Sequence, residues 1–512
     1  MKLRLISQAL RKRPFFYIDR RSLDLFYAAL GLVLLIDLLI RIPDLKAHYT
    51  HEGLLPLSAL MQHEWNIWYW SLANLSDQFY FQLFLFLVVM MAAVGMVFQY
   101  RLRWMLLVAW VGLLSIQHRN PVVLQGGDDL LRMLLFWSLF LPARSRESRA
   151  CVSGTACTIL LLQIVSVYHF SAWYKSLDEW WRDGTAIYYA LQLDQIARPL
   201  GSWIAQHPEW CALMTRCAFI LEASLLPLFL LPWPREYIRM TLFFSLVGFN
   251  VGILTTMMIG VFPHAFIAAS FLFIPHTFWE AVSKKSLYTT LQGLRQQWIG
   301  YARSKPMALW KKRAAYQIFP MFCALMVLGW NIAAIPRISW SMPSWTHPLM
   351  LGLRLDQSWG MFAPTVFKED GWYVLEAELR NGRRIDLMAP DDSLSFAKPD
   401  DVLDRYPNDR WRKYGEQLYM AHRAHLRPFY ADYLIRDWNQ NHADDQEWIQ
   451  RLWIYYMREI TLPPGQDTRI EVISLHQQSA SASAGSSENH IYEAQPTGKK
   501  DGAFRPLQPA EP

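Results

Sequence analysis

The chain has 512 residues, of which 53% are hydrophobic and 15% aromatic, and it carries a net charge of +7. The basic residues cluster in short segments between apolar runs, which is typical of membrane topology and excludes a nucleic-acid partner from our expectations. The five cysteines all lie in or beside apolar runs, without CxxC or Cys/His spacing. The sequence therefore indicates neither a disulfide framework nor a metal site.

Apolar runs of the length that a bilayer requires, about 20 residues, occur only within residues 1–336. We expect nine membrane spans, at residues 23–41, 79–99, 104–117, 129–143, 151–173, 212–231, 240–258, 261–281 and 315–335. The third and fourth are short, so we expect them to be tilted or partly enclosed. The basic segment 1–22 precedes a full-length span and lacks a cleavage site, so the first span should stay in the mature protein. The sequence thus predicts an all-α polytopic membrane bundle over residues 23–336.

The basic residues also set the orientation of the bundle. With the N-terminus in the cytoplasm, the inner loops hold 22 lysines and arginines, and the outer loops before residue 336 hold five. Loops rich in Lys and Arg stay on the cytoplasmic side of a membrane. We therefore expect a multi-pass protein of the plasma (inner) membrane, with the lipid bilayer as a partner and residues 337–512 outside.

Residues 337–475 lack a run of bilayer length and have the pattern of a small extracytoplasmic α+β domain. Helical periodicity with dense charge covers residues 400–438, and Asn381-Gly382 is a hairpin signal. Strands are predicted at residues 372–379, 384–388, 448–460 and 468–475. The last segment, 476–512, is rich in Ser, Ala, Gly, Glu and Pro, which predicts a disordered tail.

Lys175 is the residue that most suggests chemistry. It follows the fifth expected span and lies among Trp173, Tyr174, Trp180 and Trp181. Desolvation in such a place lowers the pKa of an amine toward neutrality. A neutral amine is a base and a nucleophile, whereas a protonated amine is neither, so Lys175 is our candidate catalytic residue. The alternative is that its amine reaches the lipid headgroups, as many lysines at span ends do.

Other charges lie within the apolar part of the chain. Asp37 and Arg41 are four residues apart in the first span, and Asp128 and Arg132 are four apart at the start of the fourth. Because this spacing puts both charges on one helix face, we expect structural ion pairs. Glu222 lies in mid-span with no partner nearby on its face, so another helix must supply one or the carboxyl must stay neutral.

Three outer segments, residues 48–70, 117–129 and 168–189, are rich in aromatic and polar side chains. The predicted topology puts them on one side of the membrane, so we expect a substrate pocket there that contains Lys175. An aromatic belt at the membrane interface is the alternative explanation for their Trp and Tyr residues. The candidate pocket residues are His118, Arg119, Asn120, Asp128, Asp129, Arg132, Trp181, Asp183, Glu222 and Asn250.

Several of these segments resemble one known family, the horizontally transferred transmembrane (HTTM) domain family, which includes the vitamin K-dependent γ-glutamyl carboxylase. The resemblance covers roughly residues 20–390 and is specific only as a set. It rests on Asp37–Arg41, Arg119-Asn120-Pro121, Gly126–Arg132, Lys175 with Trp181–Ala186, Leu355–Pro364 and Asp370-Gly371-Trp372.

The resemblance implies a function for Lys175. In the carboxylase a lysine deprotonates a reduced quinone, which then drives a lyase reaction on a substrate glutamate, and Lys175 is at the matching position. The implied cofactor is a vitamin K-like reduced quinone, while the residues themselves indicate none. Asn250 stands where the family has a histidine in the span after the acidic one, and an amide does not carry protons as imidazole does.

Two functions of different classes follow from the sequence. The first is a membrane enzyme, carboxylase- or epoxidase-like, that acts on a quinone-like or other lipid-soluble substrate. The second is a non-catalytic membrane factor for maturation, export or immunity of a secreted peptide, with the outer domain holding that partner. A transporter is disfavoured because the chain has no internal repeat. The first function depends on Lys175, and the second depends on the surface of residues 337–475.

Overall fold

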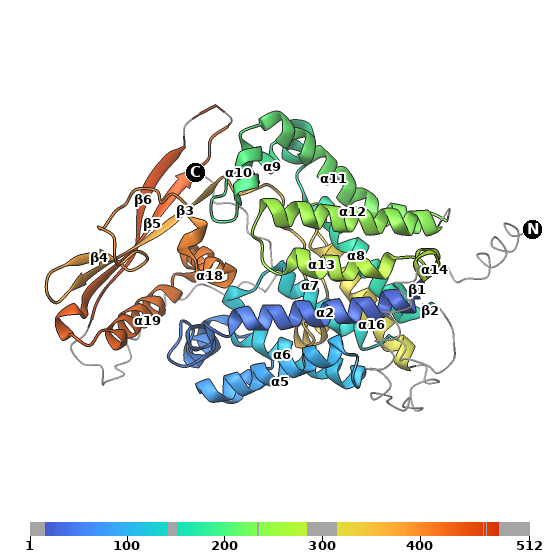
Figure 1. The fold of residues 1–512 in the computed structure, drawn as a ribbon, viewed down its shortest axis with the longest axis horizontal. Coiled ribbons are helices and arrows are strands. Elements are labelled where there is room, and N and C mark those ends of the chain that lie inside the picture. The colour runs from blue at the N-terminus through green and yellow to red at the C-terminus, as the bar shows by residue number, and fades with distance from the viewer. Residues whose placement is uncertain are drawn as a thin grey trace, which may run out of the picture.

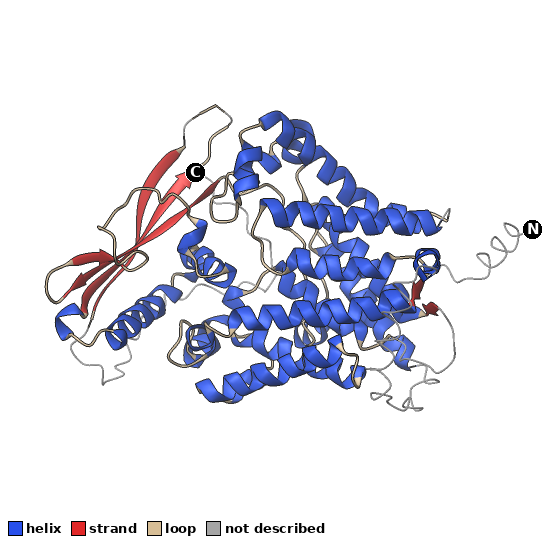
Figure 2. Ribbon diagram, in the orientation of Figure 1, coloured by secondary structure: helices blue, strands red, loops and turns tan. Residues whose placement is uncertain are grey.

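The computed structural model describes residues 16–141, 151–232, 235–283, 315–463, 465–466 and 468–480. Most of the basic N-terminal segment, most of the tail predicted at 476–512, and the inner loops 144–150 and 284–314 lie outside these ranges. The described chain is mainly helical, with a bundle at one side and a β-sheet at the other (Figure 2).

Each range expected to span the membrane contains a helix. These helices are α2 (Arg20–Arg41), α5 (Phe79–Val97), α6 (Leu102–Arg119), α7 (Gly126–Ser138), α8 (Thr155–Tyr174), α11 (Pro208–Leu230), α12 (Arg235–Thr256), α13 (Phe262–Ser270) with α14 (His276–Ser283), and α16 (Ala315–Ala333). Among the described residues, five helices are long and apolar enough to cross a membrane: α2, α5, α8, α11 and α12. A sixth span exists if the bent pair that begins with α13 and ends with α14 is one span, with an angle of 84° at its break.

The expected number of nine spans is therefore larger than the number of helices that meet the length and polarity requirements. The helix α7 has 13 residues, which at 1.5 Å per residue is about 20 Å and falls short of a bilayer core of about 30 Å. The last two residues of α6, His118 and Arg119, are polar and buried in protein. These apolar helices are those of a membrane-embedded protein.

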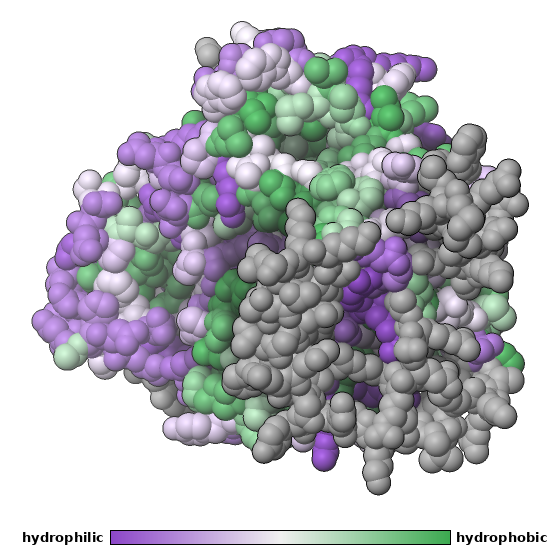
Figure 3. Space-filling model, turned by 45° about the vertical axis from the view of Figure 1, so that its right-hand side comes forward, coloured by the Kyte–Doolittle hydropathy of each residue, from purple (hydrophilic) through white to green (hydrophobic). Residues whose placement is uncertain are grey.

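Small residues let the helices of the bundle approach closely. A Cβ atom on Gly31 of α2 would be 2.7 Å from the Ala93 carbonyl oxygen of α5, and one on Gly112 of α6 would be 2.2 Å from a Val89 methyl of α5. Such contacts are typical of helix packing in membranes. The outward faces carry large apolar side chains such as Phe84, and hydrophobic residues are prominent on the surface of the bundle in Figure 3.

Short helical segments connect the long helices, and some of them, such as α9 (Ala186–Leu191) and α10 (Pro199–Ala205), lie at the end of the bundle nearest the sheet (Figure 1). The segments between α2 and α7 are α3 (Leu45–Tyr49), α4 (Leu57–Ala59), η1 (Leu60–Glu64), η2 (Leu72–Leu75) and η3 (Pro121–Val123). Those between α8 and α14 are η4 (Asp178–Asp183), α9 (Ala186–Leu191), α10 (Pro199–Ala205) and η5 (Phe271–Phe273). Those after α16 are η8 (Ser344–Thr346) and α17 (His347–Gly352).

The C-terminal part contains a four-stranded antiparallel sheet in the order β4-β3-β5-β6. Its strands are β3 (Glu369–Leu379), β4 (Arg384–Asp386), β5 (Ile449–Ile460) and β6 (Arg469–Ser479). The helices are α18 (Asp409–Tyr419) and α19 (Leu426–Asn441), with short turns η9 (Leu403–Arg405), η10 (Ala421–Arg423) and η11 (Asp445–Glu447). All four predicted strands are confirmed, and the predicted helical stretch divides into two helices. We call residues 369–479 the sheet region.

The sheet region and the bundle share packed residues. Leu54 and Val123 of the bundle loops belong to the same buried cluster as Val374 and Leu452 of the sheet. Trp359 lies beyond the expected boundary at residue 336, yet it is fully buried in the bundle core. The chain therefore returns to the bundle after its last long helix before it forms the sheet.

A second, two-stranded sheet lies at the opposite end of the bundle (Figure 1). It pairs β1 (Tyr17–Asp19) with β2 (Cys151–Ser153) in antiparallel register, with Asp19 directly opposite Cys151. The sequence pattern predicts no strand at either position. Three residues per strand are too few for an alternating pattern to stand out.

Candidate functional site

Lys175 is buried at the end of α8, with 3% of its surface exposed. Its amine forms an ion pair and hydrogen bond with the carboxylate of Glu222 on α11. The same amine lies 3.7 Å from the centroid of the Trp180 ring, where the ring face attracts a cation. Lys175 therefore points into protein rather than toward lipid headgroups.

The chain folds back after Lys175 and this turn positions Trp180. The Ser176 backbone N–H donates to the Pro364 carbonyl at 2.7 Å, and the Trp180 indole N–H donates to the Phe362 carbonyl at 3.1 Å. The turn ends at Gly184, whose φ of +73° lies in the left-handed region that favours glycine.

Burial lowers the pKa of the Lys175 amine, and the Glu222 carboxylate acts in the opposite direction. This lowering of the Lys175 pKa is the direction predicted from its sequence position for a desolvated lysine. Glu222 is also buried, with 5% exposed, so the two groups depend on each other for charge balance. Lys175 is the partner from another helix that Glu222 requires.

Two further polar residues, Tyr168 and Asn250, are buried in the same part of the bundle. The Asn250 side-chain amide on α12 donates to the Tyr168 hydroxyl at 2.7 Å and to the Leu246 carbonyl at 2.8 Å. Tyr168 lies on α8, and the Glu222 carboxylate acts on its hydroxyl electrostatically. Tyr168 and Asn250 thus form a second buried polar pair, between α8 and α12, which among the described residues is linked to the Lys175–Glu222 pair only through the charge of Glu222.

Tyr168 is not among the residues predicted for the site, although the sequence holds a signal for it. It precedes Lys175 by seven residues, and residues seven apart lie on the same face of a helix. A tyrosine on that face of an apolar helix, two turns before the lysine, marks a buried polar strip.

The remaining candidates gather in a second buried network. The Arg41 guanidinium donates to Asp37 at 2.9 Å, to Asp128 at 2.6 Å and to the Tyr49 hydroxyl at 2.9 Å. Arg410 of α18 adds a second guanidinium, 2.7 Å from Asp37 and 2.9 Å from Asp128. Two carboxylates and two guanidinium groups therefore balance in charge, away from water. Arg410 was missed because it lies in the part of the chain expected to be a separate domain.

The ion pair expected between Asp128 and Arg132 is wrong by one residue. Arg132 instead pairs with Asp129 at 2.8 Å, three residues away, and donates to the Gln117 side chain at 2.5 Å and to the Arg354 carbonyl at 2.9 Å. Residues three apart share a helix face as well as residues four apart do, so spacing alone did not decide the partner.

The side chains of His118, Arg119 and Asn120 contact backbone carbonyl groups of the segment 48–70. They do not line an open pocket. The His118 ring lies 2.6 Å from the Trp70 carbonyl oxygen through Nδ1. Arg119 donates to the Leu55 carbonyl at 2.9 Å, and Asn120 donates to the His48 carbonyl at 2.9 Å. These contacts fix residues 118–120 against the segment 48–70.

The expected single pocket around Lys175 is therefore not the arrangement found. Among the described residues, no hydrogen bond or ion pair joins Lys175 to residues 48–70 or 117–129, and the Asp183 side chain is exposed. The segment 354–366 contacts side chains next to both buried sites, the Lys175–Glu222 pair and the network around Arg41 and Asp128. It accepts from Arg132 through the Arg354 carbonyl and from Trp180 through the Phe362 carbonyl.

An apolar groove lies on the surface between α11 and the segment that follows α8. It has a volume of about 660 Å³ and is lined by Leu177, Trp181, Phe219, Ile220, Ala223, Ser224 and Pro227. Ala223 follows Glu222 in the chain, and Leu177 follows Lys175 by two residues, but neither Lys175 nor Glu222 lines the groove. The arrangement combines a protected proton donor–acceptor pair with an adjacent apolar surface.

Comparisons with protein-family models, with curated proteins and with solved structures find no match to this chain.

Proposed function

We propose that the chain is a membrane enzyme that removes a proton from a lipid-soluble weak acid, with Lys175 as the base and Glu222 as its proton partner. The observation that supports this most is the buried Lys175–Glu222 ion pair beside an apolar groove. Perturbed ionisable groups of this kind are concentrated at functional sites. The resemblance to the vitamin K-dependent carboxylase suggests a reduced quinone as the substrate class.

The proposed proton transfer has two balanced steps. The ammonium of Lys175 first passes a proton to the Glu222 carboxylate, which leaves a neutral amine and a neutral carboxylic acid with no change in net charge. The amine then accepts the proton of a substrate hydroxyl, which leaves the substrate anion next to an ammonium. Low polarity favours the neutral pair over separated charges, and the new ion pair stabilises the anion.

The groove fits the ring and tail of such a substrate. Aromatic and aliphatic side chains line it, including Trp181 and Phe219, whose rings contact each other at 6.2 Å between centroids. Trp181 is 46% exposed. We propose that the substrate ring enters along Trp181 and Leu177 and meets the amine where these side chains move aside.

We further propose the membrane arrangement that the basic residues indicate. The short helices α6, α7 and α16 complete nine crossings inside the bundle, and the N-terminus lies in the cytoplasm of a plasma (inner) membrane protein. The sheet region and Lys175 then lie at the outer face, and the sheet region serves as an extracytoplasmic domain. The basis is the distribution of 22 basic residues in inner loops against five in outer loops.

The test is oxidation of an added hydroquinone by dissolved oxygen, catalysed by the purified protein in lipid nanodiscs, because removal of the hydroxyl proton precedes transfer of electrons to oxygen. Lys175→Met should lower the rate at least 100-fold, since general-base catalysis typically contributes 10²–10⁴-fold. Lys368→Met is the matched control, because Lys368 also pairs with a glutamate, Glu179, and also lies over an aromatic ring, that of Tyr189, but is exposed. Equal rates for both variants and the wild type would reject Lys175 as the base.

A second candidate function has one observation in its favour. Strand β6 is at the edge of the sheet, and among the described strands only β5 pairs with it. Ile470 and Val472 are exposed on β6, by 47% and 59%. An extended peptide adds to such an edge through backbone hydrogen bonds. The alternative is therefore a non-catalytic factor that holds a secreted peptide on β6. This alternative predicts that adding the secreted peptide fraction slows hydrogen exchange of the β6 backbone amides. It also predicts that Lys175→Met has no effect on this slowing.

A further inference from the structure

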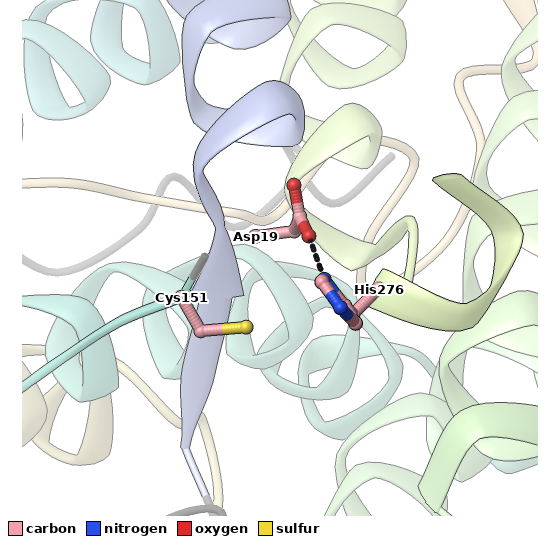
Figure 4. A group of neighbouring side chains, drawn as sticks. All are labelled: Asp19, Cys151 and His276. Atoms are coloured by element: carbon pink, nitrogen blue, oxygen red, sulfur yellow. Dashed lines mark hydrogen bonds and ion pairs between the residues drawn. The ribbon is translucent and has the colours of Figure 1, made fainter. Parts of the chain in front are cut away.

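Three residues that are far apart in the sequence meet at the end of the bundle opposite the sheet region. Asp19 ends β1, Cys151 begins β2 and His276 begins α14. One ligand-type atom of each, a carboxylate oxygen, a thiol sulfur and a ring nitrogen, lies within 4.8 Å of the other two. Figure 4 shows the three side chains on different sides of a common space.

The β1–β2 pairing brings the first two residues together. Asp19 and Cys151 are directly opposite in the antiparallel ladder. Side chains at opposed positions point to the same face, with Cβ atoms about 5 Å apart. The third residue arrives because the chain bends by 84° before α14, so His276 at its start turns toward β1.

His276 is held by carboxylates at both ring nitrogens. Its Nδ1 lies 2.6 Å from Asp19 Oδ2, and its Nε2 lies 2.8 Å from Glu280 Oε1. A neutral imidazole has a single N–H. When Nε2 donates that hydrogen to Glu280, the Nδ1 lone pair faces the Asp19 carboxylate, and two electron pairs at this distance need a positive charge between them.

Arg21 supplies positive charge at this place. Its Nη2 lies 3.0 Å from Asp19 Oδ2 and 3.1 Å from His276 Nδ1. The other oxygen, Asp19 Oδ1, is held separately by the Arg21 backbone N–H at 2.8 Å and by Nε at 3.1 Å. The Nη2 group of a long side chain can therefore leave Oδ2 while Oδ1 remains bound.

We propose that Asp19 Oδ2, Cys151 Sγ and His276 Nδ1 bind a divalent transition metal of the zinc type. Carboxylate, thiolate and imidazole are all zinc ligands, and the sulfur disfavours magnesium and calcium. Zinc binds nitrogen and oxygen ligands at about 2.0–2.2 Å and sulfur ligands at about 2.3 Å. In a tetrahedral site the ligand atoms are then roughly 3.3–3.7 Å apart. Small side-chain movements bring the three atoms to that spacing, and a water completes the four positions.

Glu280 is a positioning residue for this site. A ligand histidine commonly donates its other N–H to a carboxylate, which fixes the tautomer and the ring orientation. Arg21 competes with the metal for Asp19 Oδ2. The thiol releases its proton to solvent when the metal binds, so binding strengthens as pH rises.

This site is independent of the proposed proton transfer. It lies at the start of α8, whereas Lys175 lies at its end, about 30 Å away along a 20-residue helix. Under the proposed orientation the metal site faces the cytoplasm and Lys175 faces the exterior. Loss of one should leave the other unchanged.

The test is titration of the full chain in nanodiscs with Co²⁺, followed by displacement with Zn²⁺. The wild type should bind one cobalt per chain with a sulfur-to-cobalt absorption band in the near ultraviolet. Cys151→Ser should remove the band. Glu280→Gln should weaken cobalt binding about 10–100-fold, as is typical when a residue that hydrogen-bonds to a metal ligand is replaced. Arg21→Gln should strengthen cobalt binding. Cys217→Ser is the control, because Cys217 is an exposed cysteine on α11.

Two results would overturn the site. One is a wild type without the sulfur-to-cobalt band, and the other is a band that persists in Cys151→Ser or disappears in Cys217→Ser. Cys151 is half-buried, so its replacement by serine should not prevent folding. Lys175→Met should titrate as the wild type does, which separates this result from the test of proton transfer.

Discussion

Arg410 and Asp128 are 282 residues apart in the sequence, yet Arg410 Nη2 lies 2.9 Å from Asp128 Oδ1 and both side chains are buried. The contact fixes α18 of the sheet region to the start of α7 in the bundle. Because Arg410 also reaches Asp37 on α2, one side chain connects three helices. The position of the sheet region is therefore set by a buried ionic network as well as by apolar packing.

Replacing Arg410 should destabilise the protein strongly. Arg410→Met leaves Asp37 and Asp128 to share Arg41, and an uncompensated buried charge typically costs about 3–5 kcal/mol. The midpoint of thermal unfolding in detergent should fall accordingly. Arg182→Met is the control: its ion pair with Asp178 is exposed, and such pairs contribute about 1 kcal/mol or less. Similar midpoints for the two variants would show that the network does not hold the sheet region.

The Lys175–Glu222 pair predicts an order of expression levels. Glu222→Gln should accumulate in the membrane, because Lys175 can lose its proton and become neutral, and the amide still accepts a hydrogen bond. Glu222→Lys should not, because it buries two ammonium groups together. Exchanging both residues, Lys175→Glu with Glu222→Lys, should restore much of the level. Equal levels of the two single variants would indicate that position 222 faces water.

The proposed topology predicts the result of reporter fusions. Fusions after residues 147, 237 and 300 should report the cytoplasm, since they follow clusters of basic residues, and a fusion after residue 400 should report the exterior. An enzymatic reporter pair that is active on opposite sides gives the measurement. A cytoplasmic signal after residue 400 would mean that the number of crossings is even.

His48 predicts sensitivity to acid. Burial, with the charges of Arg41 and Arg410, lowers the pKa of His48 from 6.5 to about 3. The unfolded state therefore binds a proton at His48 at a higher pH than the folded state does. The contribution of neutral His48 to the free energy of unfolding is full above about pH 6.5 and is lost as the pH falls toward 3. His48→Phe should flatten this loss, because the ring lies 4.8 Å from Trp411 and phenylalanine keeps that contact. An unchanged pH profile of the unfolding midpoint would contradict it.

Asp370 predicts an effect of the opposite sign. Burial and the neighbouring charge of Asp194 raise the pKa of Asp370 from 3.8 to about 8. The folded state therefore favours the protonated acid, and this stability is present below pH 3.8 and lost as pH rises through 8. Asp370→Asn should raise the unfolding midpoint at pH 9 and change it less at pH 5. Asp391→Asn, at an exposed aspartate, should have little effect at either pH.

The sequence predicted those features that depend on neighbours in the chain. Apolar runs and alternating patterns located the helices and all four strands of the sheet region, because periodicity is local information. The Asp37–Arg41 spacing likewise places the two charges together, and they lie 2.9 Å apart. Among the described residues, fewer helices than the nine expected meet the length and polarity requirements of a span, and an apolar run alone does not reveal whether protein or lipid surrounds it, as α7 illustrates.

The site depended on contacts that no local pattern encodes. Glu222 finds Lys175 at a separation of 47 residues, and Arg410 finds Asp128 at 282. The Asp19, Cys151 and His276 group has no spacing of the kind that marks a metal motif, because strand pairing and a helix bend assemble it. Charges that need partners can be recognised from sequence, but which partner each one has is decided by the packing of the helices.

The pairing of β1 with β2 also affects how the protein is made. The ribosome synthesises Tyr17–Asp19 at the beginning, but their partner strand, Cys151–Ser153, emerges only after α5, α6 and α7. The start of α2 therefore stays unpaired while α5, α6 and α7 are made. The β1–β2 pair can close only once these three helices have been synthesised, and it can do so before α8 and the later helices join the bundle.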